Sequence, residues 1–87
     1  MSHTTTPTIS IRSAGPADVR TVTRLAALDS SPVPFGPVLL AEVDGTPRAA
    51  IALGDGRVVA DPFARTAELV SLLRLHAGAV SQDLVAA

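Results

Sequence analysis

The chain is 87 residues long, which is enough for one domain with one hydrophobic core. Its net charge is −1, and its seven basic residues are all arginines scattered along the sequence, so the basic stripe of a nucleic-acid-binding protein is missing. The lack of cysteine excludes disulfides, thiolate nucleophiles and cysteine-ligated zinc.

The first seven residues, MSHTTTP, are small and polar, which predicts a flexible tail at residues 1–7. His3 is alone in this tail, and a metal site needs several ligands, so no metal site is predicted. The sequence has neither a basic and apolar leader nor an apolar run of about 20 residues. We therefore expect a cytoplasmic protein with no membrane span and no nucleic-acid partner.

Residues 8–12, TISIR, alternate isoleucine with polar residues, which predicts a strand with one buried face. A helix is predicted after it, up to about residue 29, because Pro16 suits a first turn and Asp18 complements the helix dipole. Gly15 or Ser13 is the expected cap. At 100° per residue, the predicted buried side of this helix carries Val19, Val22, Leu25 and Ala26.

Three prolines in residues 30–37 disfavour a helix and predict a connector. Three apolar stretches follow at 38–43, 48–53 and 57–60, with turns containing Asp and Gly between them. Short turns join antiparallel neighbours, so the three stretches are expected to form a meander. The middle stretch is apolar on both alternating sets of positions, which indicates that both faces of the sheet are covered.

A second helix is predicted over about 66–82, where Leu69, Leu72, Leu73 and Val80 share one face. His76 projects onto that apolar side, and we interpret it as a core or interface histidine, because a catalytic base needs a partner that the sequence does not assign. The carboxylates at turns and strand ends are explained by local hydrogen bonds to the backbone; these are Asp44, Asp55 and Asp61. No catalytic residue is predicted.

These elements give an α+β fold: one mainly antiparallel sheet of about four strands with two main helices, in the order β-α-β-β-β-α. The predicted domain covers residues 8–82, and residues 83–87 are expected to form a C-terminal tail. The pattern does not decide whether the two helices share a face of the sheet.

Several segments resemble the GNAT N-acetyltransferase superfamily over about residues 8–80. The stretch ISIRSAGPAD resembles the opening strand and first helix of that family, and its matching residues are Ile9, Ile11, Arg12, Ala14, Pro16 and Asp18. The stretch VLLAEVDGTPRAAIAL resembles the second and third strands, and VVADPF resembles the fourth strand and the proline that leads to the coenzyme loop. The resemblance implies the N-terminal half of a GNAT domain.

The family binds acyl-coenzyme A with an Arg/Gln-x-x-Gly-x-Gly/Ala loop before the helix that follows its fourth strand. Here only Arg65 fits that pattern, because Glu68 and Val70 stand at the two glycine positions. A carboxylate and a branched side chain there disfavour the approach of a diphosphate to the backbone. The family's fifth strand and later elements have no counterpart in this sequence, so catalysis by one chain is not expected.

Two hypotheses about function stay open. In the first, the chain is a non-catalytic GNAT-like domain that acts by self-association, as a homodimer through the edge of the 57–60 strand or the apolar sheet face, or by binding a protein partner. It then needs no cofactor. In the second, the chain binds acyl-coenzyme A or is an N-acetyltransferase whose site is completed across a dimer. Acetyl-coenzyme A is then the cofactor, and Arg65 holds its phosphate.

Overall fold

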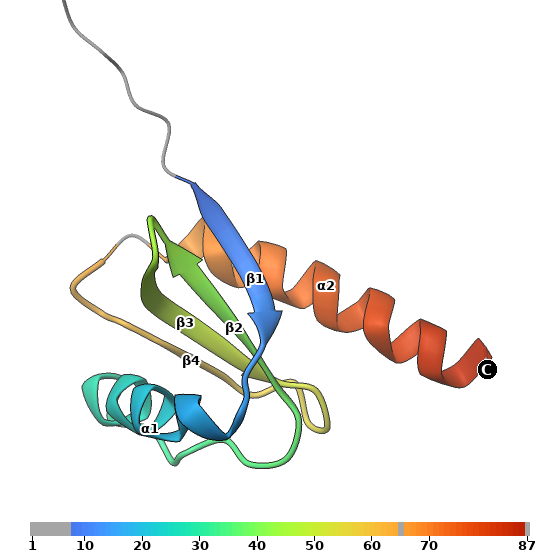
Figure 1. The fold of residues 1–87 in the computed structure, drawn as a ribbon, viewed down its shortest axis with the longest axis horizontal. Coiled ribbons are helices and arrows are strands. Elements are labelled where there is room, and N and C mark those ends of the chain that lie inside the picture. Colours follow the sequence, from blue (N-terminus) through green and yellow to red (C-terminus); the bar gives the residue numbers. More distant parts are fainter. Residues whose placement is uncertain (1–7, 65, 87) are drawn as a thin grey trace, which may run out of the picture.

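The computed structural model describes residues 8–64 and 66–86, with side chains up to Val80. Its elements follow the predicted order β-α-β-β-β-α, and the α+β fold is confirmed (Figure 1). In chain order they are β1 (Ile9–Ser13), the short 3₁₀ helix η1 (Pro16–Asp18), α1 (Val19–Leu28), β2 (Val38–Val43), β3 (Thr46–Ala52), β4 (Val58–Ala60) and α2 (Ala67–Ala86). The predicted N-terminal tail and His3 lie outside the described residues.

The four strands form one antiparallel sheet in the order β1-β2-β3-β4, so the predicted meander of the last three strands is confirmed. Asp44 and Gly45 connect β2 to β3 with φ angles of 50° and 81°. Two consecutive positive φ angles define the type I′ turn, whose twist suits a two-residue hairpin. Arg48 is an extra residue on β3, because Ala41 pairs with Ala49 while Glu42 pairs with Pro47.

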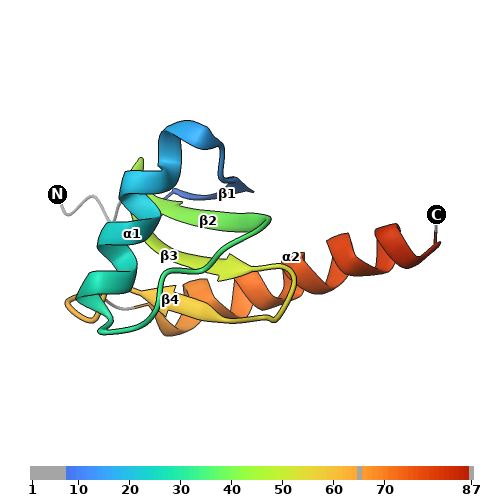
Figure 2. The ribbon, with the colours of Figure 1, turned by 90° about the horizontal axis from the view of Figure 1, so that it is seen from below.

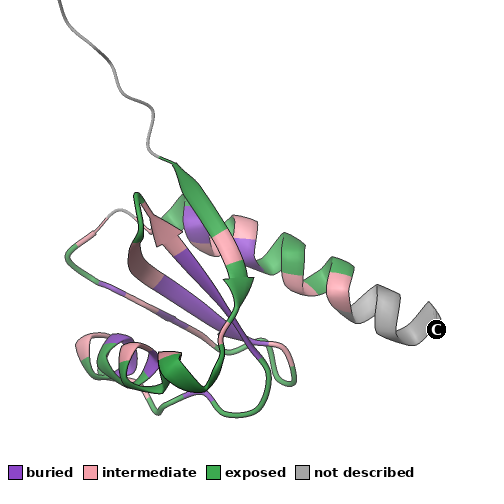
Figure 3. Cartoon of the chain, viewed as in Figure 1, coloured by how far each residue is buried: buried purple, intermediate pink, exposed green. Residues whose placement is uncertain are grey.

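The helices cover opposite faces of the sheet (Figure 2). On one face, α1 places Val22, Leu25 and Ala26 against side chains of β2, β3 and β4: Val38, Leu40, Ala50 and Val59. On the other face, α2 places Leu69 and Leu73 against Leu39, Ala41, Ala49 and Ile51. Buried residues therefore concentrate in the central strands (Figure 3), and the prediction that both faces are covered is confirmed.

The start of α1 differs from the prediction at one residue. Gly15 is the cap of η1, as expected, and Asp18 accepts a hydrogen bond from the Gly15 N–H at 2.7 Å. Val19, however, is 63% exposed, so its predicted place on the buried side is wrong. Val19 is the first residue of α1 and faces a hollow beside residues 33–36, whereas Val22 and Leu25, further along, lie over the sheet.

Helix α1 ends in a Schellman motif. The N–H of Ser31 donates to the Ala26 carbonyl at 2.9 Å, and the N–H of Ser30 donates to the Ala27 carbonyl at 3.1 Å. Ser30 has a φ of 52°, the left-handed conformation that this motif requires and that glycine adopts most readily. The chain can then turn away from the helix into the proline-containing connector.

Helix α2 begins at Ala67 and continues past the predicted end at Gln82 to Ala86. Its second half projects beyond the sheet (Figures 1 and 2). The core position expected for His76 is wrong, because the residue is exposed, although its Nδ1 does lie 2.9 Å from a backbone carbonyl oxygen, that of Leu72. The alternative position at an interface stays a prediction. His76 is on the apolar side of the helix, but at this turn the contact with the core is made by its neighbour Ala77. Within the described residues, neither helix combines the length and apolar character needed to cross a membrane.

Candidate functional site

One arginine joins three segments at the end of β1. The guanidinium of Arg12 donates to both carboxylate oxygens of Asp18 at 2.8 Å, and its Nε donates to Oε1 of Glu42 at 3.1 Å. The β1–β2 register brings Arg12 and Glu42 to the same face, because Arg12 pairs with Leu40, two residues before Glu42. Arg12 therefore connects the first strand, the start of the first helix and the second strand.

These bonds keep Asp18 ionised. The Arg12 guanidinium, with a smaller contribution from the Gly15 N–H, lowers the pKa of Asp18 from 3.8 to about 2. The carboxylates of Asp18 and Glu42 raise the pKa of Arg12, and Asp18 makes the larger contribution. A carboxylate with such a low pKa is a poor proton donor or acceptor at neutral pH, because a general acid or base works best with a pKa near the working pH. The geometry therefore assigns this cluster a structural role.

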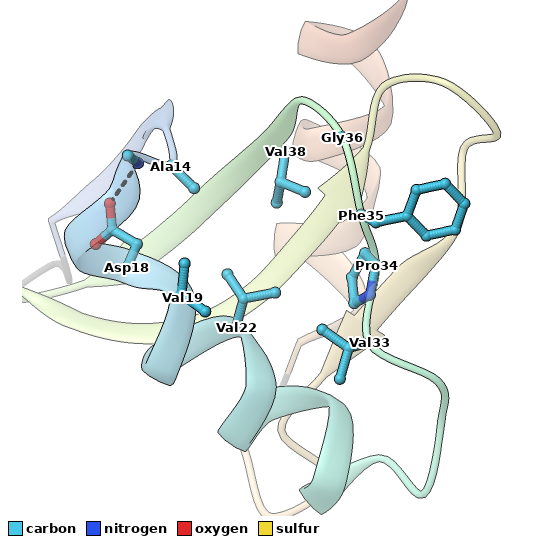
Figure 4. Close-up of a pocket in the computed structure, with 10 residues that line it drawn as sticks. Ala14, Asp18, Val19, Val22, Val33, Pro34, Phe35, Gly36 and Val38 are labelled. Atoms are coloured by element: carbon cyan, nitrogen blue, oxygen red, sulfur yellow. Dashed lines mark hydrogen bonds between the residues drawn. The ribbon is translucent and has the colours of Figure 1, made fainter.

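A hollow of about 210 Å³ lies next to this cluster, between the start of α1 and residues 33–36 (Figure 4). One wall carries Ala14, Val19 and Val22, and the other is formed by residues 33–36, where the ring of Phe35 points away from α1 (Figure 4). The hollow is smaller than the roughly 300–1,000 Å³ of typical small-molecule pockets. Its size suits one or two apolar side chains of a protein better than a nucleotide cofactor.

Exposed apolar side chains lie in and beside the hollow. Phe35 is 84% exposed, Val19 63% and Val33 45%. The carboxylate of Asp18 is also at the rim, but it is already bonded to Arg12. The sequence predicts only a connector at residues 30–37, so the hollow is not among its candidate sites. The available signal was the presence of Val33 and Phe35 among the prolines.

A second ion pair lies at the end of β4. Oδ2 of Asp61 accepts a hydrogen bond from Nη1 of Arg48 at 2.9 Å, and Oδ1 accepts one from the N–H of Phe63, also at 2.9 Å. Asp61 is only 5% exposed, so these bonds compensate for the burial of its charge. Of the other two carboxylates, Asp55 accepts from the Arg57 N–H, which is the predicted local bond, whereas Asp44 accepts from the N–H of Thr8, a residue distant in the sequence.

The segment that resembles a coenzyme loop, residues 65–70, lies at the start of α2 and includes its first residues. Arg65, the candidate phosphate-binding residue, lies outside the described residues. Glu68 is exposed in the first turn of α2, and the N–H of Val70 already donates to the Thr66 carbonyl at 2.8 Å. A carboxylate therefore stands at the N-terminal end of α2, where the helix dipole favours negative charge.

Among the residues that the structure describes, no group of three or more His, Cys, Asp or Glu side chains is placed to hold a metal ion. No model of a known protein family matches the chain, and neither a curated protein nor a solved structure is significantly similar to it.

Proposed function

We propose that this chain is a small non-catalytic domain, GNAT-like in the order of its elements, that acts by associating with protein, in first place with a second copy of itself. The observation that carries this proposal is the cluster of exposed apolar side chains around the hollow: Val19, Val33 and Phe35. Contiguous exposed apolar surface is typical of protein interaction sites. Covering it removes apolar area from water, which is the main driving force of association.

The two sets of paired charged residues support the same proposal. Arg12, Asp18 and Glu42 are bonded to one another, and Asp18 also bonds the backbone. Arg48 and Asp61 form a second pair next to the turn after β4. These groups hold strands, turns and the first helix together, so their bonds are accounted for without a substrate.

The two phenylalanines of the chain provide a matched test. Phe35 and Phe63 are 84% and 85% exposed, but only Phe35 lines the hollow. We expect sedimentation equilibrium of the full chain to reveal a dimer at micromolar concentration. Phe35→Ser should raise its dissociation constant at least tenfold, because burying a phenylalanine contributes about 1.5–3 kcal/mol. Phe63→Ser should leave the constant within about threefold. A wild-type chain that stays monomeric up to high micromolar concentration would contradict the proposal.

A further inference from the structure

The edge of the sheet formed by β4 is short and partly occupied. The strand has three residues and is followed by Pro62. The backbone groups of Arg57 and Asp61 bond to β3. Because alternate residues of a strand bond to the same neighbour, those of Val58 and Ala60 point outward. The outward N–H of Ala60 donates to Oδ2 of Asp29, at the end of α1, at 3.3 Å. Short strands and occupied backbone groups protect an edge from pairing with another chain.

The opposite edge, formed by β1, has a different character. The strand has five residues, without a proline or a bulge in its pairing with β2. Along β1 the backbone groups point alternately toward β2 and away from it. At the two ends of the strand, the Asp44 N–H donates to the Thr8 carbonyl and the Ala14 N–H donates to the Val38 carbonyl, so the even-numbered residues bond to β2. The backbone groups of the odd-numbered residues Ile9, Ile11 and Ser13 therefore point away from the sheet. Among the described residues, the contact recorded at these groups is one from the Arg12 guanidinium to the Ser13 carbonyl at 3.5 Å.

We infer that a second copy of this chain pairs its β1 with the free edge of β1, antiparallel, around a two-fold axis at Ile11. The two sheets then form one continuous sheet of twice the width. This inference rests on the proposed function and names the partner and the surface. Ala14 directly follows β1 and also lines the hollow, so the β1 edge and the hollow belong to one contact surface. The inference places the contact at β1 instead of at the strand edge near residues 57–60, because the described contacts at β4 already engage Ala60.

The charge pattern selects the register. The outward-pointing backbone groups of one β1 must face those of the other β1. The two-fold axis can therefore pass at Ile11 or, shifted by one residue, at Ser10 or Arg12. With the axis at Ile11, Arg12 faces Ser10 of the second copy. A shift toward the C-terminus places the two Arg12 side chains opposite each other, which is unfavourable. A shift toward the N-terminus leaves Ser13 without a partner inside β1. The axis at Ile11 pairs all five residues without opposing like charges.

The two faces of β1 also suit this contact. Ile9 and Ile11 lie on the α2 side, where Ile11 and Val43 pack against the core cluster. Ile9 is 40% exposed, and in this register it faces Ser13 of the second copy, with Ile11 of that copy diagonal to it. Arg12 lies on the α1 side with Asp18 and Glu42, so its charge is kept away from the strip. The apolar contact is therefore continuous with the existing core.

The absence of native cysteine allows a direct test with one introduced thiol. Across a hydrogen-bonded antiparallel pair the Cα atoms lie about 5.5 Å apart, within the range that a disulfide spans. Ile11→Cys should give a disulfide-linked dimer under mild oxidation. Leu75→Cys is the matched control, because Leu75 is 70% exposed and belongs to α2, which packs on a face of the sheet and not along the β1 edge. We expect cross-linking of Ile11→Cys to be at least tenfold faster.

A second variant keeps the test independent of the packing of Ile11. Ile9→Lys adds a charge at a residue that is already 40% exposed, and Leu75→Lys adds the same charge elsewhere. Circular dichroism checks that both variants fold. Ile9→Lys should raise the dissociation constant of the dimer at least tenfold, and Leu75→Lys should not. A dimer insensitive to Ile9→Lys, with no preferential cross-link at residue 11, would overturn this inference and leave the proposed function standing. A monomeric wild-type chain would overturn both.

Discussion

Replacing Ser30 with glycine should stabilise the domain. Ser30 occupies the left-handed position of the Schellman motif at the end of α1, with a φ of 52°. The two hydrogen bonds of the motif come from backbone N–H groups, those of Ser30 and Ser31, so they do not depend on the serine side chain at residue 30. Ser30→Gly keeps both bonds and removes the steric conflict between Cβ and the backbone.

Two opposing effects decide the magnitude. A residue with a Cβ pays roughly 1–2 kcal/mol in the left-handed conformation. Glycine loses about 0.4–1 kcal/mol more backbone entropy on folding. The steric effect is the larger, so Ser30→Gly should raise the free energy of unfolding by about 0.5–1 kcal/mol. For a domain of this size, that corresponds to an increase in Tm of roughly 2–8 °C.

Thermal unfolding followed by circular dichroism measures this change. Ser71→Gly is the matched control, because Ser71 is exposed inside α2 and its Oγ donates to the Ala67 carbonyl at 3.2 Å. In a helix interior, glycine is less favourable than serine by about 0.5 kcal/mol, so this variant should unfold at a lower temperature. If both substitutions lower Tm, the conformational argument for Ser30 is refuted.

Three further predictions concern the core, the arginine cluster and the cofactor. Leu25→Ala should lower the free energy of unfolding by about 2–5 kcal/mol, because Leu25 is 1% exposed between α1 and the sheet. In urea titrations, Leu75→Ala should change it by less than about 0.5 kcal/mol, and equal losses would contradict this assignment of the core. Asp18→Asn should cost stability above the unfolded pKa of 3.8, and the difference from wild type should disappear as the pH falls through the folded value of about 2. A difference in Tm that is as large at pH 2 as at pH 6 would refute the role of the Arg12 contact. Isothermal calorimetry with acetyl-coenzyme A should give no micromolar binding, because the Glu68 carboxylate repels a diphosphate at the start of α2. Saturable micromolar binding would instead favour the acyl-coenzyme A hypothesis.

The strands and their connections could be predicted because local sequence encodes them. The Asp44-Gly45 turn and the change from polar to apolar residues define β2, whose bounds agree with the predicted 38–43. The apolar character of β3 on both sides predicted two covered faces, and the two core clusters confirm it. That the helices lie on opposite faces was not predictable in the same way, because helical periodicity identifies an apolar side without stating what it contacts.

The errors at Val19 and His76 have one physical cause. Both residues lie on the apolar side of a helical wheel, yet both are exposed, and the core contacts come from their neighbours Val22 and Ala77. Periodicity outlines an apolar side of a helix but does not state how much of that side the neighbouring layer covers. The Arg12 bond to Glu42 also needed tertiary information, because it depends on the pairing of two strands that are 30 residues apart. The hollow depends likewise on how the connector folds back toward α1.

The alanines at the centre of β3 separate the two halves of the core. Ala49 faces the cluster under α2, while its neighbour Ala50 faces the cluster under α1, and neither is exposed. Their methyl groups let both layers approach the sheet closely. A larger side chain at one of them would therefore displace one helix and leave the other in place. Substitutions at two adjacent residues would thus affect the two sides of the domain separately. An engineer who wished to loosen either helix alone could begin at these two positions.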